Sequence, residues 1–251
     1  MTEVRQAANV VELIEWFSRH GQPATLAEIA DALGWPRSST FNLLGTLADR
    51  GYLYEPRTRG GYYPSSRWAS IAHALSMSEP LGAGIENEVA NLQAATGETV
   101  AVAAPAGTSA LYLHVLESNS AIRYSTEPGR KVPIHSTSSG RALLSQYSPS
   151  ERSSLYRKID FVFYGPATPM DATAVEGRLA EEAERGFHMS NEEYSPDLLG
   201  IAVPIRIGDR RLALTIGGPR IRCLPKIDEF VPLLVTAGLA CQQMTDGGTT
   251  R

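Results

Sequence analysis

The first fifty residues contain three short amphipathic segments with only a few residues between them, and this spacing constrains the fold more than any other feature. A first helix is expected over Val4–Arg19, where apolar residues recur at intervals of three and four. A second should begin at Thr25, which fits a capping box with Glu28, and end near Leu33. Pro36 suits the first turn of a third helix, where its missing N–H costs nothing. The pattern predicts three packed helices with short connections.

The third segment, PRSSTFNLLGTLAD, is polar at its start and apolar further along. Its inward face is predicted to hold Phe41, Leu44, Leu47 and Ala48. The leading turns carry hydrogen-bonding side chains at Arg37, Ser38, Ser39, Thr40 and Asn42. Hydroxyls and exposed N–H groups at a helix start suit phosphate contacts, and arginine or asparagine can bond purine edges in the major groove. An ordinary capped helix is the alternative interpretation, because serine is common near helix starts.

Two aromatic runs, Tyr52–Tyr54 and Tyr62–Tyr63, flank the stretch Glu55–Gly61 and predict a hairpin with a basic, glycine-ended tip. Three helices followed by such a hairpin are typical of a winged helix-turn-helix, a fold that binds double-stranded DNA. The wing arginines could enter the minor groove or touch phosphates. We therefore predict DNA contacts at Thr25, Arg37, Ser38, Ser39, Thr40, Asn42, Arg57 and Arg59.

Charge is distributed unevenly although the net charge is only −4, which argues against general polyanion binding. Residues 35–67 carry five arginines against two acidic residues, whereas the preceding segment is acidic. A basic patch alone decides little, because such patches usually serve solubility. The longest apolar stretches are strand-sized, and the N-terminus lacks the uninterrupted apolar core of a secretory signal. We expect a cytoplasmic protein that does not enter the membrane.

The two cysteines, Cys223 and Cys241, are too few for a disulfide framework or a four-cysteine zinc site, and structural packing is the expected role. No phosphate loop or cluster of metal ligands is recognisable. We therefore expect no metal and no cofactor.

The remaining chain alternates between helical and extended patterns. A helix at Arg67–Met77 is expected to link two domains, because Pro80, Gly82 and Gly84 follow it. Further helices are expected at 85–95, 137–146, 149–158, 171–185 and 228–243, and strands at 99–104, 110–116, 121–126, 200–207 and 211–217. Helices with a mostly antiparallel sheet predict an α+β module.

These segments resemble a known family. The stretch ATLAEIADALGWPRSSTFNLLGTLADRGYLYEPRTRGGYYPS is similar to the DNA-binding domain of IclR-type bacterial transcription regulators. The stretches GETVAVAAPAG, GRKVPIHSTSSGRALLSQYSPSE, GFHMSNEEYSPDLLGIAVPI and LALTIGGP resemble later parts of the same family in order and spacing. The resemblance covers the chain from about Val4 to Met244. It implies a winged helix-turn-helix over 1–66, a linker helix over 67–81 and a GAF-like effector-binding domain over 82–245.

The resemblance also implies a partner set and a ligand site. Similar regulators form homodimers or homotetramers, repress or activate transcription from near-palindromic operators, and respond to small organic acids. The turn from Ser136 to Gly140 joins a strand to a helix start, which suits an anion, although simple capping is an alternative. The residues that the family comparison places around the effector are Ser136, Thr137, Ser138, Ser139, Gly140, Ser190, Asn191, Leu198, Gly200 and Thr215.

Two departures from the family pattern bear on the effector. This chain has Gly200 where many members have cysteine, and Ser190–Asn191 where many carry an acidic residue. Both changes remove bulk or charge, so we expect a wider, less negative cavity that accepts an aromatic carboxylate. Glu192 and Glu193 are expected to be surface or structural residues.

Two other classes of function have some support in the sequence. A serine hydrolase could use the adjacent His135 and Ser136, but neighbouring residues on an extended segment point to opposite faces, and no Gly-x-Ser-x-Gly elbow is present. We expect no enzymatic activity, and a packed, hydrogen-bonded His135. A winged helix that contacts only other proteins is the second alternative; it would lack salt-dependent duplex binding.

Overall fold

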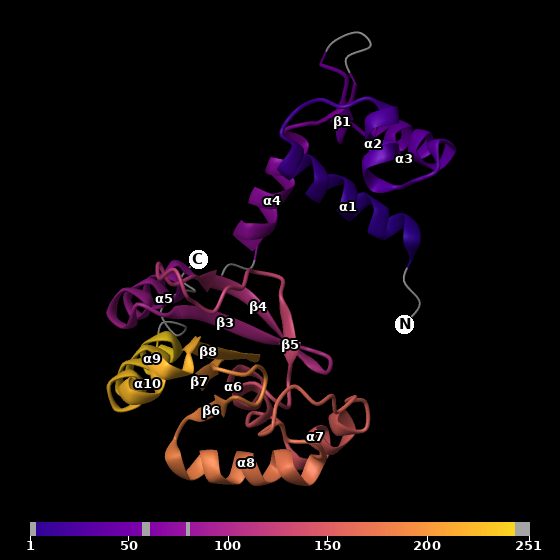
Figure 1. Cartoon of the computed structure of the whole chain (residues 1–251). Coiled ribbons are helices and arrows are strands. Elements are labelled where there is room, and N and C mark those ends of the chain that lie inside the picture. The colour runs from indigo at the N-terminus through magenta and orange to yellow at the C-terminus, as the bar shows by residue number, and fades with distance from the viewer. Residues whose placement is uncertain (1–3, 57–60, 79–80, 244–251) are drawn as a thin grey trace. The chain divides into compact units, whose positions relative to one another are not determined.

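A computed structural model describes residues 4–56, 61–78 and 81–243 of the chain. By internal contacts the chain divides into two compact units, Met1–Pro80 and Leu81–Arg251, which are drawn in Figure 1. Arg57 and Arg59, both predicted to contact DNA, lie outside the described residues.

The first unit contains the predicted helices and hairpin. Its elements are α1 (Arg5–His20), α2 (Leu26–Leu33), α3 (Arg37–Asp49), β1 (Leu53–Tyr54), β2 (Tyr63–Pro64) and α4 (Arg67–Ser78). The capping box of Thr25 and Glu28 is present at the start of α2. Strands β1 and β2 pair antiparallel, with Leu53 opposite Pro64. Gly61 has a φ of 85°, and a Cβ there would lie 2.4 Å from the carbonyl of Ala24, so the base of the wing requires glycine.

The buried face of α3 differs from the predicted one by one position. Leu44 and Leu47 are buried as expected, but Phe41 is 61 % exposed and Thr40 is completely buried. Thr40 can occupy the core because its hydroxyl donates to the carbonyl of Pro36 at 3.1 Å, which satisfies its polar atom locally. The prediction that Phe41 packs inward was therefore wrong, and Thr40 is not placed to contact DNA.

The second unit is built on an antiparallel sheet with the strand order β5-β4-β3-β8-β7-β6. Its strands are β3 (Thr99–Ala106), β4 (Ser109–Leu116), β5 (Lys131–Pro133), β6 (His188–Asn191), β7 (Leu198–Ile207) and β8 (Arg210–Pro219). Its helices are α5 (Ala83–Thr96), α6 (Ser138–Leu144), α7 (Pro149–Tyr156), α8 (Ala172–Arg185), α9 (Arg220–Cys223), the 3-10 turn η1 (Leu224–Lys226) and α10 (Ile227–Gln243). Helices α5 and α10 cover one face, and α6 and α8 lie toward the other (Figure 1). This is the expected α+β architecture with a GAF-like C-terminal domain.

The two faces of the sheet carry residues of different size. Large side chains such as Val102, Ile201 and Leu214 pack against α5 and α10. Alanines such as Ala103 and Ala213 alternate with them and face the other core, which includes residues of α6 and α8. Small residues on that face leave room between the sheet and α6.

One predicted strand is absent. Residues 121–126 form no strand, because their polar groups are satisfied by side chains instead of a ladder. The Glu117 carboxylate accepts hydrogen bonds from the Ser125 hydroxyl and the Thr126 N–H, and the Thr99 hydroxyl donates to the Tyr124 carbonyl at 2.6 Å. The two edge strands of the sheet, β5 and β6, were not predicted.

Helix α6 is fixed by Arg141, the largest completely buried side chain among the described residues. Its guanidinium bonds both oxygens of Glu182 on α8 at 3.0 Å, the Glu193 carboxylate and the carbonyl of Met189 on β6. Glu182 also lies 2.7 Å from Nδ1 of His188. Burial would raise the pKa of Glu182, but the bonds from His188 and Arg141 outweigh it and lower the pKa to about 2. Burial raises the pKa of Glu193 despite Arg141. One arginine thus ties α6 to α8 and β6.

We predict that Glu182→Gln lowers the free energy of unfolding by roughly 3–5 kcal/mol, since it removes one partner of a buried ion pair. The contribution of the Glu182 carboxylate to the free energy of unfolding should be complete above the ordinary pKa of 4.5. It should disappear as the pH falls toward 2, because the pKa of Glu182 is lowered in the folded state. Urea unfolding of the wild type and the variants at several pH values measures this loss of unfolding free energy. Glu181→Gln on the same helix is the matched control: its pair with Arg178 is exposed and should be worth less than about 1 kcal/mol. Equal losses in both variants would contradict the assignment.

Candidate nucleic-acid interface and ligand cavity

The start of α3 presents most of the predicted DNA contacts to solvent. Arg37, Ser38, Ser39 and Asn42 are all exposed. The N-cap residue is Pro36, and no side chain of the described residues caps this end of the helix. The first N–H groups of α3 therefore have no side-chain acceptor among the described residues. An anion-binding helix start needs such unoccupied N–H groups.

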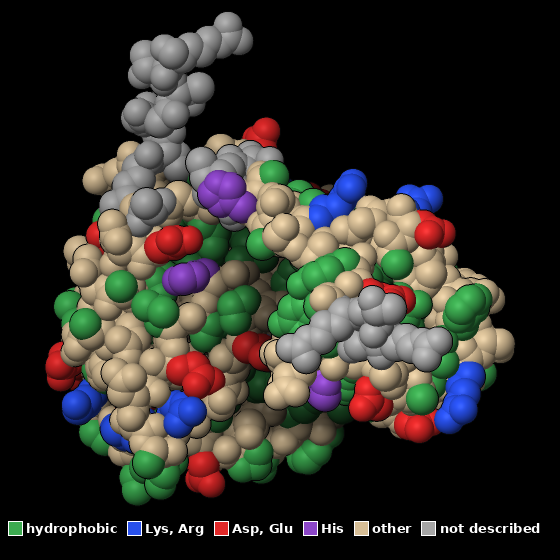
Figure 2. Space-filling model, turned by 90° about the horizontal axis from the view of Figure 1, so that it is seen from above, with side chains coloured by type: hydrophobic (Ala, Val, Ile, Leu, Met, Phe, Trp, Pro, Cys, Tyr) green, Lys and Arg blue, Asp and Glu red, His purple; other side chains and the backbone are tan. Residues whose placement is uncertain are grey.

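Two of the predicted DNA contacts, Arg37 and Thr25, already have an acidic partner within the protein. Asp31 on α2 is 3.9 Å from the Arg37 guanidinium, and both side chains are more than two-thirds exposed, so this ion pair is weak and can be exchanged for DNA. Glu28 accepts from the hydroxyl and the N–H of Thr25, which are thus engaged with a carboxylate of the protein itself. On the face shown in Figure 2, Lys and Arg side chains are interspersed with Asp and Glu. The basic side chains on this face are dispersed among acidic ones, so individual contacts with DNA are favoured over attraction by one broad positive surface.

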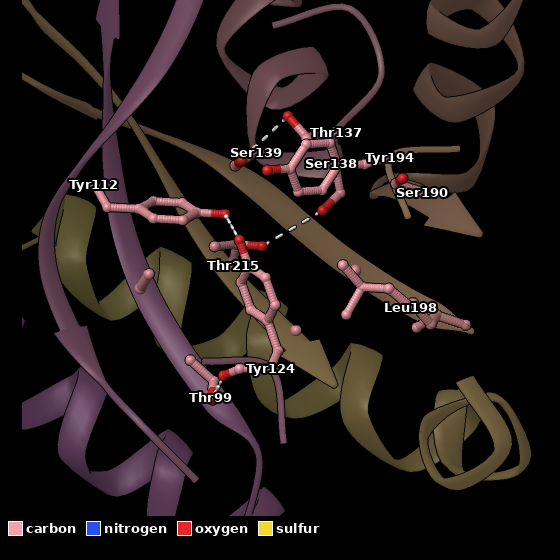
Figure 3. Close-up of a pocket in the computed structure, with 14 residues that line it drawn as sticks. Thr99, Tyr112, Tyr124, Thr137, Ser138, Ser139, Ser190, Tyr194, Leu198 and Thr215 are labelled. Carbon is pink, nitrogen blue, oxygen red and sulfur yellow. Dashed lines mark hydrogen bonds between the residues drawn. The ribbon is translucent and has the colours of Figure 1, made fainter. Parts of the chain in front are cut away.

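The second unit contains a cavity between α6 and the small-residue face of the sheet (Figure 3). The strand register places Thr99, Gly217, Gly200 and Ser190 side by side across β3, β8, β7 and β6. A Cβ at Gly200 would lie 2.8 Å from the Ser138 hydroxyl oxygen, so α6 lies close to the sheet here. The floor of the cavity is a row of small residues across four strands.

Hydroxyl groups from opposite walls meet in this cavity (Figure 3). Ser138 Oγ lies 3.4 Å from Thr215 Oγ1, and because Thr215 donates to the Ile201 carbonyl, Ser138 is the donor between them. The hydroxyls of Tyr112 and Tyr124 are 3.5 Å apart. Burial raises the pKa of both phenols, that of Tyr112 well above its ordinary value. Both are neutral at physiological pH and can donate hydrogen bonds.

The cavity continues into a neighbouring groove. The empty space among its lining atoms, including the mouth, is about 390 Å³. Tyr124, Tyr194 and Leu198 also line a neighbouring open groove. These three side chains therefore stand at the mouth of the cavity.

Seven of the ten predicted effector residues line this cavity, namely Thr137, Ser138, Ser139, Ser190, Leu198, Gly200 and Thr215. The other three do not. Ser136 uses its carbonyl to accept from Ser190. At Gly140 a Cβ would lie 2.2 Å from the Ile134 carbonyl oxygen, so this glycine serves close packing. Asn191 turns to Arg220 and accepts from its Nε at 2.9 Å. That the seven lining residues contact a ligand stays a prediction.

Sequence reasoning missed seven lining residues: Thr99, Ala101, Tyr112, Tyr124, Tyr194, Leu199 and Gly217. A signal for some of them was present, because small residues alternate with large apolar ones along β3 and β8. The tyrosines carried no such signal, since Tyr124 lies in a segment expected to be a strand and Tyr194 follows the Glu192–Glu193 pair. Glu193 itself is buried and structural, through its bond to Arg141.

His135 and Ser136 do not form a catalytic pair. His135 is buried against Phe161, with ring centroids 5.1 Å apart. Neither of its ring nitrogens nor the Ser136 hydroxyl has a hydrogen-bond partner of ideal geometry among the described residues. The expected packing of His135 is confirmed, and its hydrogen bond, for which the backbone of Val162 is the candidate partner, stays a prediction. Burial and the charge of Arg141 lower the pKa of His135, so its ring is neutral at physiological pH.

Cys223 and Cys241 are both buried and unpaired, and burial raises the pKa of the Cys223 thiol to about 12. Within residues 4–56, 61–78 and 81–243, no group of three or more His, Cys, Asp or Glu side chains could hold a metal ion. In the same part of the chain, no helix has the length and apolar composition needed to cross a bilayer.

Comparison with known proteins decides the family. The family model "Bacterial transcriptional regulator IclR C-terminal" matches residues 78–242, and "IclR helix-turn-helix domain" matches residues 6–57. The chain belongs to the IclR family of bacterial transcriptional regulators. Its helix-turn-helix domain is the DNA-binding domain of that family, so α3 is the helix that follows the turn.

Other IclR-family proteins are similar along most of their length. The "Transcriptional repressor IclR" of Escherichia coli (strain K12) is 27 % identical over 246 residues, which cover 94 % of this chain and 88 % of that protein. The crystal structure of the Thermotoga maritima IclR aligns with a TM-score of 0.79 and 18 % identity over 97 % of this chain and 99 % of that one. An IclR homolog from Microbacterium hydrocarbonoxydans, complexed with 4-hydroxybenzoate, aligns with a TM-score of 0.76 and 22 % identity over 97 % and 100 %.

Proposed function

We propose that this IclR-family regulator is a cytoplasmic repressor that binds a near-palindromic operator through α3 and the wing, and whose DNA affinity changes when a small, aromatic carboxylic acid binds the α6 cavity. The observation that carries the proposal is the cavity itself, because polar groups from α6 and the sheet converge in a largely apolar pocket. The name of the Escherichia coli relative supports repression. We propose no catalytic role, since the chain offers no paired nucleophile and base at His135 and Ser136.

On the DNA side, α3 combines two kinds of contact. Its uncapped N-terminus and the exposed Ser38 and Ser39 can bond a phosphate, which fixes the position of the helix. Arg37 and Asn42 are five residues apart, both are exposed, and both side chains can reach purine edges. Specificity is therefore expected from the first two turns of α3, and affinity from phosphate contacts that include Arg57 and Arg59.

We predict that Arg37→Ala costs about 1–3 kcal/mol of binding free energy on the preferred duplex and relaxes sequence preference, because it removes a base contact. Arg59→Ala on the wing should weaken all duplexes alike and reduce the slope of affinity against salt by about one. Fluorescence anisotropy with preferred and scrambled duplexes at several salt concentrations measures both. The assignment fails if the two variants affect preferred and scrambled DNA equally.

On the ligand side, none of the fourteen residues that line the cavity, all of them described, carries a charge. A carboxylate there must be held by neutral donors such as the hydroxyls of Ser138 and Ser139. Their bonds to other lining residues, at 3.4 and 3.5 Å, are long enough to be exchanged for a ligand. The rings of Tyr112, Tyr124 and Tyr194 provide flat apolar walls, which suit an aromatic ring. The neighbour complexed with 4-hydroxybenzoate supports this class of ligand.

We predict that 4-hydroxybenzoate binds the full-length chain more tightly than 4-hydroxybenzamide, because an amide cannot replace a charge-assisted hydrogen bond. Ser138→Ala or Ser139→Ala should weaken binding of the acid by roughly 1–3 kcal/mol and leave DNA affinity without ligand nearly unchanged. Isothermal titration calorimetry measures this. Ser145→Ala is the control, since Ser145 lies at the far end of α6 and bonds Ala142. Equal affinity for acid and amide, or no response to either cavity serine, would place the ligand elsewhere.

We also propose that the protein is a homodimer or homotetramer, because a near-palindromic site requires two DNA-reading domains related by symmetry. Helices α1 and α4 carry exposed apolar residues, Val11 and Leu75, which could contribute to pairing. Light scattering at micromolar concentration should give a mass of at least two chains. A monomer both with and without DNA would contradict this proposal.

A further inference from the structure

Phe41 is the exposed aromatic residue of α3, and its location is specific. Its side chain is 61 % exposed although phenylalanine is normally buried. Arg37 precedes it by four residues and Gly45 follows it by four, so the three lie along one edge of the helix. Ser38, three residues earlier, borders the same edge. Phe41 thus lies among the residues that face DNA in the proposed function, not apart from them.

Single exposed apolar residues are common on protein surfaces, so exposure alone would carry no argument. The position of Phe41 is what indicates a role in DNA binding, because the first two turns of the second helix of a helix-turn-helix contact base edges. The buried side of α3 is already filled by Thr40, Leu44 and Leu47, and Phe41 therefore adds nothing to that core.

Gly45 is a second, independent observation on the same edge. It lies in the interior of α3, where glycine is less favourable than alanine. Among the described residues, no atom lies within 4 Å of a Cβ built at Gly45, and its φ is not in the left-handed region. Neither the packing of the protein nor the backbone conformation requires glycine here. A helix without a side chain at this position can approach another molecule more closely.

Resting on the proposed function, we propose that Phe41 contacts the C5-methyl group of a thymine in the major groove and that Gly45 allows α3 to approach the base edges closely. Thymine is the only base that presents a methyl group in the major groove, and phenylalanine is a suitable apolar partner for it. Burying one methyl group changes affinity by about fourfold. Phe41 is then a specificity-determining residue that hydrogen-bond reasoning alone does not find.

The test removes only the methyl group. The full-length chain is used to select its preferred duplex from random-sequence DNA, and each thymine of that duplex is then replaced in turn by deoxyuridine. For the wild-type chain, affinity should fall about fourfold at a specific thymine of a half-site. Phe41→Ala should bind the unmodified duplex more weakly and show no loss at that position. Phe163→Ala, which removes an exposed phenylalanine from the second unit, should respond to uracil like the wild type.

Gly45→Ala tests the close approach separately. It should raise the thermal midpoint, since alanine favours a helix and nothing obstructs its Cβ, while it weakens duplex binding several-fold. The inference is overturned if no thymine methyl affects wild-type affinity, if Phe41→Ala keeps the same methyl dependence, or if Gly45→Ala binds DNA as the wild type does. Failure to select any duplex would overturn the proposed function as well, so the two failures are distinguishable.

Discussion

The buried guanidinium of Arg141 determines where helix α6 lies, and the cavity depends on that helix. A charge without access to water must be compensated by several partners at once, and Arg141 finds them in Glu182, Glu193 and two backbone carbonyls. These partners belong to α8, β6 and the segments next to them, so the position of α6 is specified from several directions. Ser138 and Ser139 precede Arg141 by three and two residues and are held over the sheet as a result.

The sheet contributes the space that Arg141 alone could not provide. Large side chains fill the face toward α5 and α10, whereas the face toward α6 carries alanine, threonine and glycine at the matching positions. If the residues at Gly200 or Gly217 were larger, their side chains would meet Ser138 or Tyr124, and the cavity would close. An ion cluster at the middle of α6 and small residues beneath its first turn therefore combine to form the cavity.

Local signals in the sequence predicted much of this fold, and tertiary contacts account for the failures. The capping box at Thr25, the proline at the start of α3 and the alternating strands were visible because each depends on neighbouring residues. Residues 121–126 looked like a strand but are held by Glu117 and Thr99, which no local pattern reveals. Phe41 looked like a core residue until the structure showed that Thr40 satisfies its own hydroxyl and takes the buried position.

The candidate site shows the same contrast between residues that sequence patterns reveal and residues that only tertiary contacts bring together. Seven of the residues that line the cavity were predicted through the resemblance to a family, which reports on spatial neighbours indirectly, whereas Tyr112 and Tyr124 come from segments that carry no motif. Ser136 and Gly140 were predicted as parts of the turn before α6, and Asn191 from the family resemblance, yet all three contact other parts of the protein and do not line the cavity. Side-chain direction on a turn or strand is set by contacts that the sequence alone does not display.

The central claim is that one chain couples a ligand in the α6 cavity to DNA binding, and such coupling must appear as a change in affinity. The most direct measurement is the affinity of the full-length chain for its selected duplex, with and without saturating 4-hydroxybenzoate, benzoate and related small aromatic acids. We predict that at least one acid changes this affinity by about fivefold or more, and that DNA changes the affinity for that acid by the same factor. Unchanged DNA affinity across the whole series of acids would contradict the account.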